Sequence, residues 1–106
     1  MNMKMNQILK QAGELQKKLQ EKQAELEKRS FSAQAGGGMV TATVNGKSEL
    51  VALKIEPEVI NKDEADMLQD LVIAAVNEAA RQAAEASQDQ MGSLMGNMGL
   101  KIPGLF

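Results

Sequence analysis

Apolar side chains recur every three or four residues in the first part of the chain, which is the spacing of one face of an α-helix. These positions are Met5, Ile8, Ala12, Leu15, Leu19 and Leu26, with Lys22 filling one place in the row. Oppositely charged residues four apart, such as Glu14 and Lys18, support a helix in the same region. We therefore expect an amphipathic helix over residues 5–26, and its apolar row is called the first-helix seam below.

Beyond residue 29 the pattern changes to the alternation that is typical of strands. Residues 30–35 predict a short first strand, and Gly36-Gly37-Gly38 ends it, because glycine clusters mark turns. The next segment, MVTATVNGKSELVALKI, alternates on both sides of Asn45-Gly46 and therefore predicts a hairpin.

An Asn-Gly pair favours a two-residue hairpin turn in which both residues adopt a positive φ. That turn would pair Val40 with Val51, and it would place Leu50 on the polar face. There Leu50 is either an ordinary exposed leucine, which we favour, or a residue covered by a neighbouring chain. The residues expected on the apolar face are Val40, Ala42, Val44, Val51, Leu53 and Ile55.

A second helix is predicted after Pro57. Asn61 followed by Glu64 matches a capping box, and further acidic residues suit the positive end of the helix dipole. The helix should continue to about Gln90. Its inward stripe is expected at Leu68, Val72, Ala75, Ala79, Ala83 and Ala86. Residues 91–106 mix glycine and methionine without a period, which predicts a flexible tail.

The order of helix, strands and helix predicts an α+β fold, with residues 1–90 as a single domain and residues 91–106 as the tail. A helix of about 25 residues is about 38 Å long, whereas strands of about six to eight residues span only about 20–27 Å. The sheet therefore cannot cover the helices fully, and a second copy is the simplest cover for the remaining apolar surface. We expect a homodimer with Leu15, Leu19 and Leu26 as the first interface candidates.

The amino-acid composition excludes most kinds of catalytic site. The 106 residues include no Cys and no His, which excludes disulfides, thiolate nucleophiles, imidazole bases and zinc-type sites. Asp63, Asp66 and Asp70 are better explained by the start of a helix than by a metal site. We expect no enzyme activity, cofactor, bound metal or small-molecule substrate. The lack of a long apolar run predicts a soluble intracellular protein with no membrane partner.

Several segments together resemble the YbaB/EbfC family of small bacterial nucleoid-associated proteins. They are the opening helix MNQILKQAGELQKKLQEKQAELEK, the glycine break GGGMVTATVNG, the strand exit LKIEP, the second helix ADMLQDLVIAAVNEA and the final GLF. The resemblance covers nearly the whole chain. It implies an α-β-β-β-α fold with a three-stranded antiparallel sheet, a dimer with projecting helices, binding of double-stranded DNA with little sequence preference, and a cytoplasmic, nucleoid location.

Charge is unevenly distributed along the chain. Residues 1–29 carry seven Lys or Arg and four acids, a net of +3, whereas residues 30–106 carry five and ten, a net of −5. Cations on the first helix could contact DNA phosphates without reading bases, or they could form a solvated face of intrahelical ion pairs. The candidates are Lys4, Lys10, Lys17, Lys18, Lys22, Lys28 and Arg29, together with Arg81, which could instead pair with Asn77, Glu78 or Glu85.

The same features leave a second class of function open. Long helices with exposed apolar positions and a Met/Gly-rich tail could dock another protein, which would make the chain a protein-interaction adaptor. Salt-dependent binding to unrelated duplexes distinguishes DNA binding from this alternative.

Overall fold

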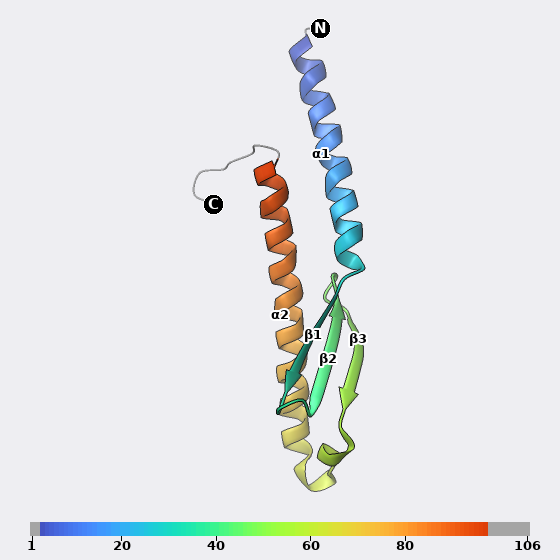
Figure 1. The fold of residues 1–106 in the computed structure, drawn as a ribbon, viewed down its shortest axis with the longest axis vertical. Coiled ribbons are helices and arrows are strands. Elements are labelled where there is room, and N and C mark those ends of the chain that lie inside the picture. Colours follow the sequence, from blue (N-terminus) through green and yellow to red (C-terminus); the bar gives the residue numbers. More distant parts are fainter. Residues whose placement is uncertain (1–2, 98–106) are drawn as a thin grey trace.

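The computed structural model describes residues 3–97. It contains a long helix, a three-stranded sheet and a second long helix, in that order along the chain (Figure 1). The elements are α1 (Met3–Glu27), β1 (Ser30–Ala35), β2 (Val40–Asn45), β3 (Leu50–Ile55), two short 3-10 turns (Pro57–Val59 and Lys62–Glu64) and α2 (Ala65–Asn97). The sheet is antiparallel in the order β1-β2-β3. The predicted α-β-β-β-α arrangement is confirmed.

The core lies between α2 and the two strands β1 and β2. Ala75, Ala79 and Ala83 are fully buried in the predicted stripe of α2, and they pack against the equally buried Val40 and Ala42 of β2. Because alanine is small, the helix backbone can approach the sheet closely, but each contact buries little apolar area. Larger side chains at the margins of the stripe, such as Leu68 and Val72, complete the packing.

Strand β3 lies at the edge of the sheet and is poorly covered. Leu50, Val51 and Leu53 keep 48%, 57% and 40% of their surface exposed, whereas Val44 on the neighbouring strand keeps 1%. α2 packs chiefly across β1 and β2, so its alanine stripe does not extend over the third strand. An apolar edge strand of this kind is a surface that another chain can cover.

The predicted two-residue hairpin turn is wrong. Val40 pairs with Ile55 rather than with Val51, and a bulge beside Val44 brings Leu50 opposite that residue. The loop comprises residues 46–48. Its last residue, Ser48, has a φ of 63°, which is the left-handed conformation typical of the third position in a three-residue hairpin loop. The partner of Val40 thus differs from the predicted one by four residues. Because this number is even, Leu53 and Ile55 stay on the expected face of the sheet. The bulge brings Leu50 onto the same face.

The Asn45 side chain explains the longer loop. Its Oδ1 accepts hydrogen bonds from the backbone N–H groups of Lys47 and Glu49 at 2.9 and 3.1 Å, and its Nδ2 donates to Glu49 Oε1 at 2.9 Å. An Asn side chain that caps backbone donors in this way competes with the tight turn that the Asn-Gly pair suggested.

Gly46 is required for a different reason from the predicted positive φ. Among the glycines of residues 3–97, those with a positive φ are at 36, 37 and 38. A Cβ on Gly46 would lie 1.9 Å from the carbonyl oxygen of Leu26 and 2.9 Å from the backbone nitrogen of Glu27. The hairpin loop therefore touches the end of α1 at a point where only glycine fits.

The second helix begins as predicted and ends later. Asn61 Oδ1 accepts from the backbone N–H of Asp63 at 3.0 Å, and a 3-10 turn then leads into α2. The helix continues to Asn97 instead of ending near Gln90, because Leu94 is buried against α1 and offsets the cost of nearby helical glycines. The first part of the expected tail is therefore helical, and residues 98–106 lie outside the described part of the chain.

The molecule is elongated, with extents of 74 × 27 × 16 Å. α1 and α2 run antiparallel and touch only near the sheet (Figure 1). Since both helices rise about 1.5 Å per residue, the contact of Gln90 with Lys22 puts the end of α2 about level with Leu15. The first turns of α1 project beyond this point, and Ile8 and Leu9 there are 57% and 61% exposed.

Candidate nucleic-acid interface

All the predicted cations of α1 and of the link to β1 lie on the surface. They are Lys4, Lys10, Lys17, Lys18, Lys22, Lys28 and Arg29. Lys4 and Lys10 belong to the projecting turns, whereas Lys22 lies where α1 meets α2. One helix thus carries exposed positive charge from its free end down to the sheet.

Two ion pairs that involve this helix are solvent-exposed. Lys22 Nζ lies 3.5 Å from Glu25 Oε2, one turn along α1, and Lys47 of the hairpin loop lies 3.9 Å from Glu27. Exposed pairs of this kind contribute at most about 1 kcal/mol and are screened by salt. Such weak pairs can exchange a carboxylate partner for a phosphate.

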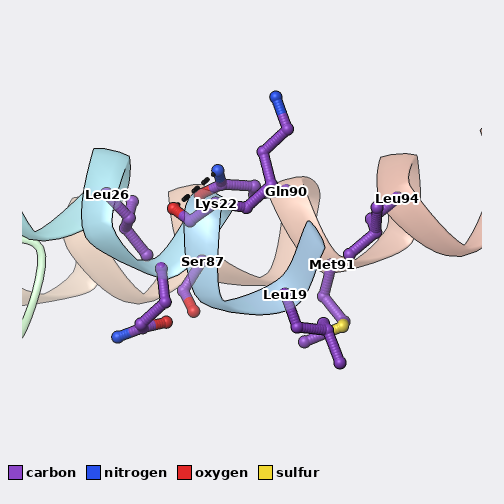
Figure 2. A pocket seen from close by; sticks show the side chains of 8 residues that line it. Leu19, Lys22, Leu26, Ser87, Gln90, Met91 and Leu94 are labelled. Atoms are coloured by element: carbon purple, nitrogen blue, oxygen red, sulfur yellow. Dashed lines mark hydrogen bonds between the residues drawn. The ribbon is translucent and has the colours of Figure 1, made fainter. Parts of the chain in front are cut away.

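The junction between α1 and α2 is built from apolar contacts and one polar tie (Figure 2). Leu26 and Leu94 are buried at 2% and 5% exposure, and Leu19 and Met91 lie beside one another at the more open side. Gln90 Nε2 donates to the backbone carbonyl of Lys22 at 3.0 Å. This bond fixes the level at which the two helices meet, while the Lys22 ammonium extends away from the pocket.

An open hollow borders this junction, and it is lined by cations from the α1 side and by polar residues from α2. We call it the α1–α2 hollow, and its lining residues are Lys22, Arg29, Ala86, Asp89, Gln90, Ser93 and Leu94. The Arg29 guanidinium carbon lies 4.9 Å from the centre of the Phe31 ring, and Phe31 is itself buried. A guanidinium attracted to the face of a fixed ring keeps its N–H groups available to donate.

Arg81 forms ion pairs within its own helix, which is one of the two alternatives that the sequence left open. Its guanidinium is 2.7 Å from carboxylate oxygens of both Glu78 and Glu85. Hydrogen bonding from Arg81 holds the pKa of the Glu78 carboxyl below its ordinary value, and the same pair raises the pKa of Arg81 further. Arg81 is therefore engaged by two carboxylates on its own helix.

The interface candidates of the first-helix seam fall into two groups. Leu26 is buried within its own chain, so it offers no surface to a second copy. Leu15 and Leu19 are only half-buried. The more exposed apolar surface lies on β3, where Leu50, Val51 and Leu53 keep 40–57% of their surface exposed.

Two further features are absent between residues 3 and 97. That part of the chain contains no group of acidic residues arranged to hold a metal ion. None of its helices is both long and apolar enough to cross a membrane. Sequence reasoning also missed Asp89, Gln90 and Ser93, because the second helix was expected to end near them and only its continuation places them beside α1.

Comparison with known proteins gives matches along nearly the whole chain. The family model described as the YbaB/EbfC DNA-binding family matches residues 1–98. A nucleoid-associated protein of Clostridium acetobutylicum is 48% identical over 101 residues, which cover 95% of this chain and 88% of the relative. Another from Clostridium perfringens is 51% identical over 102 residues, covering 96% and 89%.

A solved structure has the same fold. The crystal structure of an uncharacterized protein from Helicobacter pylori aligns with a TM-score of 0.75 at 20% sequence identity, covering 90% of this chain and 98% of that one. At this identity the likeness concerns the fold alone.

Proposed function

This chain belongs to the YbaB/EbfC DNA-binding family, and we propose that it binds double-stranded DNA as a homodimer with little sequence preference. In this role it would associate with the nucleoid and influence its organisation and gene expression. The relatives that match over most of their length carry the name nucleoid-associated protein.

The observation that carries the proposal is the row of exposed cations on α1. Electrostatic contacts with phosphates need well-spaced positive charges and no base-reading side chains, which accounts for low sequence preference. The projecting turns hold Lys4 and Lys10 clear of the acidic remainder of the chain. The first turns of α1 therefore present exposed positive charge on a projecting helix that a duplex can approach.

Double-stranded DNA suits this surface better than single strands. Binding of splayed bases uses exposed aromatic rings as stacking platforms. Phe31 is buried and lies under the Arg29 guanidinium, so its ring cannot receive a base. Phe106, the other ring in the sequence, lies outside the described residues.

A salt titration tests the proposal. Fluorescence anisotropy should show binding to short duplexes of unrelated sequence with similar affinity, and log K should fall linearly with log salt. The double variant Lys18→Gln/Lys22→Gln should weaken all duplexes alike and reduce the salt slope by about two, since each phosphate contact contributes about 0.9.

The matched control removes the same charge at the other end of the molecule. Lys54→Gln/Lys62→Gln changes one residue of β3 and one of the turn before α2, and it should leave the slope unchanged. Absence of duplex binding by the wild-type protein at low salt would refute the proposal. A stoichiometric protein partner in its place would support the adaptor alternative.

Homodimerisation is supported by apolar surface that one chain leaves open. Leu50, Val51 and Leu53 of β3 are exposed beside the sheet core, and Ile8 and Leu9 are exposed on the projecting turns of α1. A second copy that covers β3 would remove both the apolar area and the unpaired strand edge from water. It would also double the number of α1 helices that meet a duplex.

A further inference from the structure

We propose that the α1–α2 hollow is a binding site for one backbone phosphate of the duplex, with Arg29 as its main donor and Asp89 as a built-in opposing charge. This inference rests on the proposed DNA binding and identifies where one contact is made. It extends the contact surface from the cations of α1 to side chains of α2.

The donors of the hollow come from two elements that the chain separates widely. Lys22 and Arg29 lie at the α1 side, and Ser93 lies across from them on α2. The Gln90 bond to the Lys22 carbonyl holds the two sides at a fixed level. A phosphate entering the hollow would meet the side chains of Lys22, Arg29 and Ser93 without a rearrangement of the helices.

Arg29 is better prepared for a phosphate than the lysines of α1. The Phe31 ring lies 4.9 Å beneath it, and the cation–π contact favours a position of the guanidinium over the ring face. A planar fork held in place matches two phosphate oxygens and loses less side-chain entropy on binding than a mobile ammonium. Phe31 is anchored in the core, so the fold itself orients the guanidinium.

Asp89 should lower the affinity of the hollow for a phosphate. Asp89 lines the same hollow as Lys22 and Arg29, so its negative charge offsets these cations in the free protein and repels an incoming phosphate. The hollow therefore has a smaller net positive charge than its cations alone would give. Replacing the carboxylate with a neutral amide should strengthen DNA binding, which is a gain that a purely structural residue would not produce.

The test uses anisotropy titrations with two unrelated duplexes over a range of salt concentrations. Arg29→Gln should weaken binding about fivefold to tenfold at 0.1 M salt and reduce the salt slope by about one. Arg29→Lys should keep the slope but bind more weakly than wild type, because the charge remains while the stacked fork is lost.

Asp89→Asn should bind several-fold more tightly at low salt, with the difference shrinking at high salt. Asp70→Asn, which removes an exposed carboxylate near the start of α2, should bind like wild type. Circular dichroism of each variant checks that the fold is retained. The opposite directions expected for Arg29→Gln and Asp89→Asn separate a local charge effect from general damage.

The outcomes distinguish the two proposals. If the wild-type protein binds no duplex, the proposed function fails and this inference fails with it. If wild type binds but Arg29→Gln and Asp89→Asn both match its affinity and slope, the hollow is not a phosphate site while the proposed function stands. Equal strengthening by Asp89→Asn and Asp70→Asn would also overturn the inference, because the effect would then be one of overall charge.

Discussion

Replacing Gly46 with alanine should destabilise the fold at the point where the hairpin loop meets α1. The added Cβ would lie 1.9 Å from the Leu26 carbonyl oxygen and 2.4 Å from its carbon. Ordinary contact needs about 3.4 Å between such atoms, so the loop or the helix end must move by more than 1 Å. Both neighbouring atoms belong to backbone, which has no rotamer that could relieve the contact.

The expected cost follows from what that movement would disturb. The same Leu26 carbonyl accepts the Arg29 backbone N–H at 3.0 Å, and the Leu26 side chain is buried in the core. Overpacking of this kind typically costs about 1–3 kcal/mol. For a domain of this size each kcal/mol lowers Tm by about 4–8 °C, so thermal unfolding followed by circular dichroism should show a fall of at least about 4 °C.

Two further variants separate this explanation from a requirement for positive φ. Asparagine tolerates the left-handed region, so Gly46→Asn would be mild if φ were the reason, but it carries a Cβ and should be as harmful as alanine. Gly13→Ala has open space around its Cβ and should stabilise the helix by about 1 kcal/mol. All variants need the same protein concentration, because dimerisation would make Tm concentration-dependent. A wild-type Tm for Gly46→Ala would refute the reasoning.

Three other changes have defined outcomes. Leu53→Lys places a charge on the exposed face of β3 and should reduce the light-scattering mass to one chain; a retained dimer would place the interface elsewhere. Ala79→Leu overfills the fully buried stripe of α2 and should cost about 1–3 kcal/mol in urea unfolding, whereas the exposed Ala74→Leu should cost little. Arg81→Gln should lower Tm at neutral pH. That deficit should disappear as acid protonates Glu78 through its lowered pKa, because a carboxylate with a depressed folded pKa stabilises only while ionised.

Periodicity predicted the elements of this fold well, because each element obeys a local rule. The alanine row from Ala75 to Ala83 has helical spacing and is buried as expected. Alternation placed β1 at residues 30–35, the bounds that the structure has. The Asn61 cap marked the start of the second helical region. These features depend on neighbours within one or two turns, which the sequence displays directly.

The features that the sequence did not predict depend on contacts between distant residues. The hairpin register reflects the Asn45 side chain and the approach of Leu26 from α1, neither of which an Asn-Gly pair reveals. The later end of α2 reflects burial of Leu94 against α1. The polar side of the hollow was missed for the same reason, since Ser93 becomes relevant only when α2 extends beside Lys22.

The projecting turns of α1 link stability to the proposed function. Isolated helices shorter than about 12–15 residues are marginal in water, and Ile8 and Leu9 receive little cover from their own chain. The spacing between Lys4 and Lys10 is fixed only while these turns remain helical. Phosphate binding to cations held at a fixed spacing should therefore favour the helix, as any ligand stabilises the state that it binds. Circular dichroism at 222 nm, a standard helix band, should show helix content rising on addition of duplex DNA. An unchanged signal during saturable binding would mean that these turns are fully helical beforehand or take no part in the contact. Lys4→Gln/Lys10→Gln distinguishes these cases, because it weakens binding only where the turns contact DNA.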